Sequence, residues 1–277
     1  RAGALGVGLV AAVVVALLGV ASPWQSGGGE TTATTGSRQG AHEGRGGLAD
    51  DAAPAPVTPA FVPSKPKRLS GVEYRWAPVV RAVAARAAPG EGARGVAMLA
   101  TTTPEGTANI VLTLGRATDA AGGLWVRVRL PILPAGSLGW VPRSALGGYE
   151  SVRTHLVVDL DALRASLYRN SRRIFTADVG VGTAEAPTPT GEFYVRSKLE
   201  RYRSPFYGPI AFGTSARSPV LTDWPAGGFV GIHGTNRPDL LPGRVSHGCI
   251  RMRNDDILRL AQLLPVGTPL TIRGSSA

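Results

Sequence analysis

The sequence predicts a mostly β protein that carries one amphipathic helix near its end. From Thr154 onward apolar and polar residues alternate, with Leu156, Val158 and Leu160 on one face, which is the period of a half-buried strand. Over residues 71–148, short apolar runs recur between turn-forming residues, a spacing that is typical of a small all-β unit. Residues 254–264 differ from both regions because their apolar positions follow helical spacing.

The C-terminal region, residues 151–274, is expected to form the larger β domain. It begins with a hairpin that joins residues 154–160 to residues 164–170 through a short turn. Further strands are expected at residues 173–181, 191–197, 210–213, 229–233, 245–250 and 269–272.

The helix has recognisable signals at both ends. Asn254 is the expected N-cap, and Asp255 and Asp256 suit the positive end of the helix dipole. Pro265 ends the pattern. One apolar stripe contains Ile257, Leu260, Ala261 and Leu264.

Residues 71–150 are expected to form a separate small β domain. Apolar runs lie at residues 79–85, 96–100, 109–114, 124–130 and 139–141. The segment Trp125-Val126-Arg127-Val128-Arg129-Leu130 alternates faces, and Gly139-Trp140-Val141-Pro142 follows a turn rich in Pro and Gly. This pair resembles the hairpin at the end of a bacterial SH3-like domain, which implies a small β barrel. We interpret Trp125 and Trp140 as packing residues rather than ligand platforms.

The N-terminal region indicates a membrane segment followed by a tether. Residues 4–22 carry no charge, and a helix of that length nearly crosses a hydrocarbon core of about 30 Å. We expect residues 1–22 to be a membrane anchor, or a cleaved signal with a weak cleavage site at Gly19-Val20-Ala21. Residues 23–70 are rich in Gly, Ser, Thr, Ala and Pro and predict a disordered linker. An extracytoplasmic, cell-envelope protein, membrane-anchored or secreted, is therefore expected.

The composition is basic, with 30 Lys and Arg against 19 Asp and Glu and a formal net charge of +11. Such a charge favours polyanionic neighbours. The sequence has no aromatic RNA-binding motif, zinc-finger spacing or dense Lys/Arg helix, so we expect no nucleic-acid binding. A basic, solvated surface is the preferred interpretation.

The chain has one cysteine, Cys249. A single thiol in an exported chain forms an intermolecular bond, lies inert in a core, or reacts. Gly248 precedes Cys249, and His247 lies two residues before it; residues two apart in an extended segment share a face. His233, in Gly231-Ile232-His233-Gly234-Thr235, could approach from a separate strand end. A nearby base makes a thiol nucleophilic, and the N–H groups of Gly248 and Cys249 would be open to a developing oxyanion.

Ile232-His233-Gly234-Thr235 followed by Ser246-His247-Gly248-Cys249-Ile250-Arg251-Met252 resembles the catalytic motif of the YkuD-type L,D-transpeptidases. Thr188-Pro189-Thr190-Gly191-Glu192-Phe193 is similar to that family's "TPxGxF" strand, and Asn254-Asp255-Asp256 opens the following helix. The resemblance covers residues 153–273. It implies a β sandwich or barrel with one helix and a site at the mouth of a groove.

The resemblance also implies roles for individual residues. Cys249 would attack the carbonyl between residues three and four of a peptidoglycan stem tetrapeptide, D-Ala would leave, and an acceptor stem would resolve the thioester into a 3→3 cross-link. His233 matches the general base, oriented by the carbonyl of Gly234. His247 matches a residue that supports the oxyanion hole, and Ser246 one that hydrogen-bonds within the site. Carbapenems are expected to acylate the same thiol.

Substrate contacts are predicted less directly. Arg251 stands where many family members have Asn, and a guanidinium can pair with a substrate carboxylate. The remaining candidates for substrate binding are Ile232, Tyr207, Phe206 and Trp224. His155 has no partner motif and is interpreted as an exposed or hydrogen-bonded strand residue. His233, His247 and Cys249 could alternatively ligate zinc, but no fourth ligand lies nearby, so we expect neither a metal nor a cofactor.

Two rival functions remain open from the sequence. Water could resolve the same thioester, which would make the chain an L,D-carboxypeptidase. Alternatively, the domains could only adhere to the cell wall without catalysing a reaction. The presence of every residue that the resemblance requires favours an enzyme.

Overall fold

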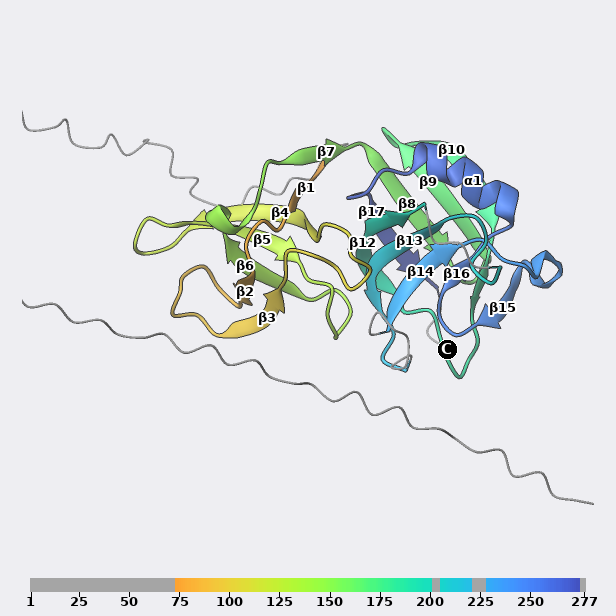
Figure 1. Cartoon of the computed structure of the whole chain (residues 1–277), viewed down its shortest axis with the longest axis horizontal. Helices are drawn as coiled ribbons and strands as arrows, with labels where there is room; N and C mark the ends of the chain where they lie inside the picture. The colour runs from red at the N-terminus through yellow and green to blue at the C-terminus, as the bar shows by residue number, and fades with distance from the viewer. Residues whose placement is uncertain (1–72, 201–204, 221–227, 275–277) are drawn as a thin grey trace, which may run out of the picture. The chain divides into compact units, whose positions relative to one another are not determined.

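The computed structural model describes residues 73–200, 205–220 and 228–274. Figure 1 shows these residues as two β regions, one built from the first seven strands and the other from the last ten. Within the described residues, α1 (Asn254–Leu263) is the only α-helix. The expected mostly β fold with a single helix is confirmed.

The N-terminal β region is a seven-stranded antiparallel sheet with the order β3-β2-β6-β5-β4-β1-β7. Its strands are β1 (Tyr74–Pro78), β2 (Val83–Arg86), β3 (Gly95–Leu99), β4 (Ile110–Thr118), β5 (Leu124–Arg129), β6 (Leu138–Pro142) and β7 (Glu150–Val152). A 3-10 turn, η1 (Arg143–Ala145), follows β6. The apolar run 79–85 is not one strand, because β1 ends at Pro78 and β2 begins at Val83.

The interior of this sheet is apolar. Val126, Val128 and Val141 lie in one core cluster. Trp125 is 2% exposed, and its Nε1 donates to Asp119 at 2.7 Å, which confirms its interpretation as a packing residue. The SH3-like identity of this region stays a prediction.

The C-terminal β region is a ten-stranded mixed sheet with the order β10-β9-β8-β17-β12-β13-β14-β16-β11-β15. Its strands are β8 (Thr154–Asp159), β9 (Arg164–Arg169), β10 (Arg172–Asp178), β11 (Gly180–Gly182), β12 (Gly191–Leu199), β13 (Ala211–Arg217), β14 (Phe229–His233), β15 (Gly243–Ser246), β16 (Ile250–Arg251) and β17 (Pro269–Arg273). A second 3-10 turn, η2 (Pro238–Leu240), lies between β14 and β15.

Most C-terminal strand predictions match the structure. The hairpin is β8–β9, in which Thr154 pairs with Arg169, and β14 spans the predicted residues 229–233. Two predicted strands are each two strands in the structure. Residues 173–181 divide into β10 and β11, and residues 245–250 divide into β15 and β16. The second break is central to the site.

The helix covers the core of this sheet. Ile257 and Leu260 are fully buried in the larger core cluster, as expected for an amphipathic helix. Figure 1 shows α1 beside β9 and β10, and Arg259 lies over the ring of Phe175 on β10 at 5.5 Å. The predicted cap is wrong: Arg253 is the N-cap and Asn254 is the first helical residue.

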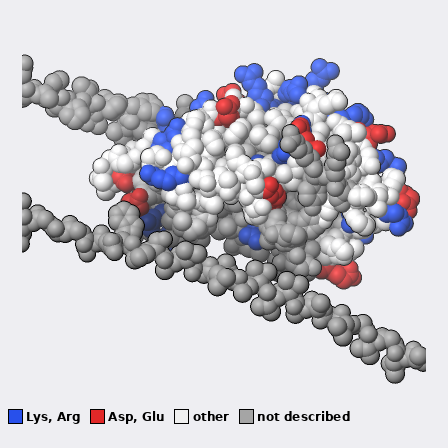
Figure 2. Space-filling view, in the orientation of Figure 1, with Lys and Arg blue, Asp and Glu red and all other residues white. Residues whose placement is uncertain are grey.

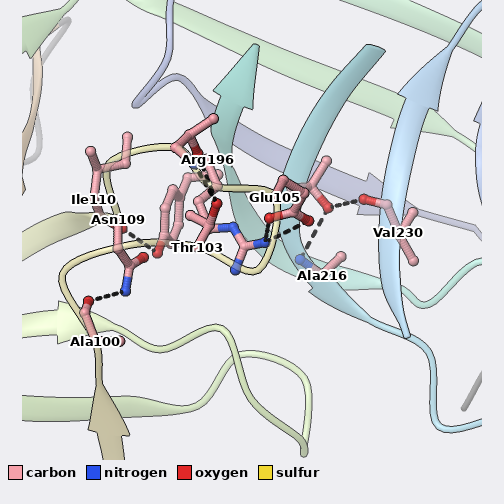
Figure 3. Close-up of polar contacts among 11 residues, drawn as sticks. Ala100, Thr103, Glu105, Asn109, Ile110, Arg196, Ala216 and Val230 are labelled. Atoms are coloured by element: carbon pink, nitrogen blue, oxygen red, sulfur yellow. Dashed lines mark hydrogen bonds and ion pairs between the residues drawn. The ribbon is translucent and has the colours of Figure 1, made fainter. Parts of the chain in front are cut away.

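Side chains of the two β regions meet in the contacts drawn in Figure 3. Tyr194 of β12 is fully buried, and its hydroxyl donates to the carbonyl of Ile110 at 2.9 Å. Arg196, also on β12, donates through Nη2 to both carboxylate oxygens of Glu105 at 3.0 and 3.1 Å. The guanidinium of Arg196 also lies over the ring of Phe229, 3.8 Å from its centroid.

The charged surface is mixed rather than concentrated. Figure 2 shows Lys and Arg scattered over the visible face, with Asp and Glu among them, on a surface that consists mostly of other residues. Among the described residues, no helix is long and apolar enough to span a membrane. The membrane or signal segment predicted at residues 1–22 and the linker predicted at residues 23–70 lie outside the described residues.

Candidate active site

Strand β14 places a histidine and a glycine on the same side of the sheet. Side chains alternate along a strand, so Gly231 and His233 share one face while Val230 and Ile232 point into the core, where both are fully buried. His233 is the last residue of β14 and is itself 3% exposed. The strand therefore presents an imidazole beside a position that has no side chain.

Cys249 reaches this position through the neighbouring strand. β16 pairs with β14 in parallel, with Ile250 opposite Ile232 and Arg251 opposite His233, so Cys249 lies next to Gly231. The N–H of Gly231 donates to Sγ of Cys249 at 3.4 Å. A Cβ placed on Gly231 would lie 3.8 Å from Sγ of Cys249 and 3.8 Å from Cδ2 of His233. The thiol and the imidazole thus flank the same glycine, and His233 approaches Cys249 from a separate strand end.

The imidazole of His233 is oriented by the backbone. Nδ1 lies 2.6 Å from the carbonyl oxygen of Gly234; a carbonyl only accepts, so Nδ1 carries the proton and Nε2 keeps its lone pair. The ring of Tyr207 packs edge-on against it, with the centroids 4.7 Å apart. This arrangement gives His233 the tautomer that a general base requires.

Burial keeps both groups neutral at rest. Desolvation lowers the pKa of His233 to about 4, the Gly234 carbonyl opposes this change, and the charge of Arg251 adds to it. Desolvation also raises the pKa of the Cys249 thiol above its ordinary value of 9.0, although the Gly231 N–H and Arg251 act in the opposite direction. Near neutral pH the site therefore holds a thiol and a neutral imidazole rather than a thiolate–imidazolium pair.

A tight turn between β15 and β16 sets the position of Cys249. Ser246, which is 2% exposed, donates through Oγ to the carbonyl of Cys249 at 2.6 Å and accepts from the N–H of Gly248 at 3.1 Å. Gly248 has a φ of +116°, which favours glycine. Thr188 Oγ1 donates to the Gly248 carbonyl at 2.9 Å and accepts from the N–H of Gly182 at 2.8 Å.

This turn corrects two predictions. The N–H of Gly248 is not open to an oxyanion, because it already donates to Ser246. For the Cys249 N–H, in contrast, no acceptor is found among the described residues. His247 and Cys249 do not share a face, since residues 247 and 248 form a bend that leaves His247 exposed and Cys249 buried.

The C-terminal sheet also matches known proteins. Residues 153–272 match the model of the YkuD family, the L,D-transpeptidase catalytic domain. The chain is 40% identical over 118 residues to the Bacillus subtilis protein named L,D-transpeptidase YkuD, which covers 43% of this chain and 65% of the relative. It is 32% identical over 123 residues to the YkuD L,D-transpeptidase of Bacillus licheniformis, covering 44% of this chain and 67% of the relative. This chain belongs to the YkuD family of L,D-transpeptidase catalytic domains.

The match between this YkuD-family chain and its relatives is partial. The chain spans about two thirds of the length of both Bacillus relatives, and the family model matches residues 153–272 alone. The catalytic domain of the Enterococcus faecium L,D-transpeptidase, a solved structure, is 28% identical over 43% of this chain and 96% of that chain, with a TM-score of 0.34.

The side chain of Arg251, a residue of the YkuD-family motif, is held by a backbone carbonyl. Its Nη1 donates to the carbonyl of Val245 at 3.2 Å, and its Nε is buried with no partner among the described residues. Its positive charge acts on both His233 and Cys249. The predicted role in binding a substrate carboxylate stays a prediction.

The remaining residues predicted to contact substrate differ in how exposed their side chains are. The side chain of Ile232 is fully buried in the core, so its predicted contact with substrate would involve its backbone and stays a prediction. Tyr207 is half-buried against His233, while Phe206 is 70% exposed. Trp224 lies outside the described residues.

Two residues near the YkuD-family site were missed by the sequence interpretation. Asn254 accepts from the N–H of Thr235 at 3.0 Å through Oδ1, so it joins the start of α1 to the loop after His233. Thr188 supports the turn before Cys249, although its segment was noted only as part of a motif. His155, in contrast, bonds Thr271 Oγ1 at 2.8 Å as a hydrogen-bonded strand residue. Among the described residues, no group of three or more His, Cys, Asp or Glu side chains is placed to hold a metal.

Proposed function

We propose that this chain is a peptidoglycan L,D-transpeptidase that forms 3→3 cross-links through a thioester on Cys249. The observation that carries the proposal is the position of Cys249 Sγ and the His233 ring on either side of Gly231. Membership of the YkuD family, whose relatives are named L,D-transpeptidases, supports the same reaction class.

The proposed acylation begins from the neutral pair. His233 Nε2 takes the thiol proton as Sγ bonds to the carbonyl carbon between residues three and four of a donor stem tetrapeptide. The carbonyl oxygen becomes an oxyanion, for which the Cys249 N–H is the available backbone donor. The tetrahedral intermediate then expels D-Ala, whose amine receives the proton from His233. Sγ remains as a thioester.

The second half-reaction uses the same groups in reverse. The side-chain amine of a diamino acid on an acceptor stem attacks the thioester, and His233 accepts a proton from the amine. Collapse of the intermediate breaks the bond between Sγ and carbon and returns the proton to the thiol. The product is an amide cross-link, and the enzyme is restored.

Carbapenems present a strained carbonyl to the same thiol, and we propose that they acylate Cys249. The uncharged residues 4–22 support a location outside the cytoplasm, anchored to the membrane or secreted, with residues 23–70 as a spacer. The antiparallel order of the N-terminal sheet is compatible with an SH3-like domain over residues 71–150.

The experiment that tests this function follows products from purified disaccharide-tetrapeptide by mass spectrometry. We expect release of D-Ala together with cross-linked dimers. A tripeptide product without dimers would instead identify an L,D-carboxypeptidase, because water would have resolved the thioester. His233→Gln should abolish both products, whereas His155→Gln is the matched control because His155 bonds Thr271 on a different pair of strands. Equal loss in both variants, or unchanged products in His233→Gln, would overturn the proposal.

A further inference from the structure

The two peptide groups that follow His233 are both held by the chain that follows Cys249. The carbonyl of His233 accepts from the N–H of Met252 at 2.9 Å. The N–H of Thr235 donates to Oδ1 of Asn254 at 3.0 Å. Met252 and Asn254 lie three and five residues after Cys249, so the segment that carries the nucleophile also holds the backbone behind the base.

The second of these peptide groups, which joins Gly234 to Thr235, is hydrogen-bonded at both ends. Its carbonyl oxygen, that of Gly234, lies 2.6 Å from Nδ1 of His233, and its N–H is the one that donates to Asn254. The carbonyl and the N–H of a trans peptide group lie in one plane and point in opposite directions. A hydrogen bond on the Asn254 side of this rigid group therefore restrains the direction in which the carbonyl points on the His233 side.

The side-chain oxygen of Asn254 fits closely against the backbone. A Cβ built on Gly208 would lie 2.5 Å from this oxygen, and a Cβ built on Gly234 would collide with it. Gly208 has a φ of +67° and follows Tyr207, whose ring packs against His233. Although Asn254 as a whole is exposed, its oxygen thus contacts both the segment that carries Tyr207 and the segment that carries His233.

Capping of α1 does not explain this contact. Arg253 is the N-cap, Asn254 is the first helical residue, and the cap makes no side-chain hydrogen bond. The oxygen of Asn254 instead accepts from Thr235, whose own hydroxyl accepts from the N–H of Arg237 at 3.0 Å. The polar end of Asn254 is therefore directed at the loop behind His233 and not at the first turn of its own helix.

The tautomer of His233 depends on where the Gly234 carbonyl points. With Nδ1–H directed at this carbonyl, Nε2 keeps its lone pair. Cδ2, the carbon bonded to Nε2, lies beside Gly231, as Sγ of Cys249 does. If the carbonyl turned away, the proton could move to Nε2, and that nitrogen could not take a proton from the thiol. Linked hydrogen bonds also polarise one another, so Asn254 strengthens the carbonyl as an acceptor.

We propose that Asn254 is a positioning residue for the general base. Its side-chain oxygen holds the Gly234–Thr235 peptide group so that the carbonyl keeps His233 in the Nδ1–H tautomer. Asn254 acts through the backbone and not on the substrate. This role rests on the proposed function, in which Nε2 of His233 takes the thiol proton, but the tautomer is a property of the resting protein and is measured without substrate.

The first measurement is the tautomer of His233 in the full chain at neutral pH, read by NMR from nitrogen-15-labelled histidine. The signals of His233 are those missing from His233→Gln. We expect the Nδ1–H form in the wild type and a mixture with the Nε2–H form in Asn254→Ala. Asn254→Asp should recover the Nδ1–H form, because its carboxylate keeps an acceptor oxygen. An unchanged tautomer in Asn254→Ala, or a mixture in Asn254→Asp, would overturn the proposal.

The second measurement is the rate of D-Ala release from disaccharide-tetrapeptide. We expect kcat in Asn254→Ala to fall by about tenfold, with KM within about twofold of wild type, because the base and not substrate binding is affected. Asp255→Ala is the matched control: Asp255 is exposed in the same turn of α1, and its loss should leave kcat and the tautomer unchanged. Thermal unfolding verifies that each variant is folded, and Asn254→Ser, whose side chain is too short to reach Thr235, replaces Asn254→Ala if that variant is not.

The outcomes distinguish this role from the proposed function. If the wild type releases no D-Ala, the proposed function fails, while the tautomer in Asn254→Ala still decides the role of Asn254. A loss of kcat in Asn254→Ala with an unchanged tautomer would show a structural contribution alone and would overturn the positioning role. A mixed tautomer without loss of kcat, or an equal loss of kcat in Asp255→Ala, would overturn it as well.

Discussion

The backbone N–H of Gly231 donates to Sγ of Cys249 across the pairing of β14 with β16, at 3.4 Å. This bond holds the thiol beside the strand that ends in His233. It also offers the sulfur a donor that favours the thiolate, but burial outweighs this effect and keeps the pKa of Cys249 raised. The sulfur of Cys249 is therefore already in position in the resting enzyme, but it rests as a neutral thiol and becomes a thiolate only when a base takes its proton.

The first prediction concerns the protonation state of Cys249. Because its pKa lies above 9.0, we expect iodoacetamide to modify the free enzyme slowly at neutral pH and faster as the pH rises beyond 9. Alkylation rates measured between pH 5 and pH 10 verify this, with Cys249→Ala as the unreactive control. A rate that already reaches its plateau below pH 7 would show a preformed thiolate instead.

The second prediction follows from the buried His233. Its folded pKa of about 4 lies below the ordinary value of 6.5, so the unfolded chain takes up the proton first. The stability is fully present above pH 6.5 and is lost as the pH falls towards 4, by at most about 3 kcal/mol. Denaturant unfolding at pH 7.5 and pH 4 should show a smaller acid-side loss in His233→Gln than in wild type. The same loss in both proteins would contradict the burial of a neutral imidazole.

The third prediction concerns the turn that carries Cys249. Ser246→Ala removes the hydroxyl that bonds both the Gly248 N–H and the Cys249 carbonyl. We expect the free energy of unfolding to fall by about 1–3 kcal/mol, and kcat to fall on the order of 100-fold because the nucleophile is displaced. Ser166→Ala is the control, since Ser166 lies on β9 and has only one long hydroxyl contact, 3.5 Å from Thr176. Full activity in Ser246→Ala would show that the turn needs no such support.

The fourth prediction concerns the ion pair between Glu105 and Arg196 (Figure 3). The side chain of Arg196 is 3% exposed, so Glu105→Gln leaves a buried charge without its partner. We expect a loss of about 3–5 kcal/mol in chemical denaturation. Glu91→Gln is the matched control: Glu91 pairs with Arg86 at the same distance, 3.0 Å, but its side chain is 76% exposed, and its loss should cost less than about 1 kcal/mol. Similar losses of unfolding free energy in Glu105→Gln and Glu91→Gln would contradict the idea that burial makes the Glu105–Arg196 ion pair the more important one.

Local patterns predicted the strands of the C-terminal sheet, whereas the pairing of Cys249 with His233 was predicted from the resemblance of their motifs to the family. Alternation along residues 229–233 is enough to place Ile232 in the core, but its position in a motif led to its assignment as a substrate contact. Because the side chain of Ile232 is fully buried, only its backbone is left for such a contact.

What could not be predicted depends on contacts between distant segments. The bend at residues 247 and 248 depends on the Ser246 hydroxyl and on Thr188, sixty residues from Gly248 in sequence. Asparagine is a preferred N-cap residue, yet the side chain of Asn254 bonds Thr235 instead of the first turn of α1. Helix-cap preferences describe hydrogen bonds between a side chain and the nearby backbone. Here the Asn254 side chain bonds the distant N–H of Thr235 instead.

The most direct test of Cys249 as the acyl-accepting nucleophile is intact-protein mass spectrometry after brief incubation with disaccharide-tetrapeptide. We predict an adduct with the mass of the donor less D-Ala, localised to Cys249 by peptide mapping and absent from Cys249→Ala. Release of D-Ala by Cys249→Ala at the wild-type rate, or an adduct that persists in that variant, would contradict the assignment.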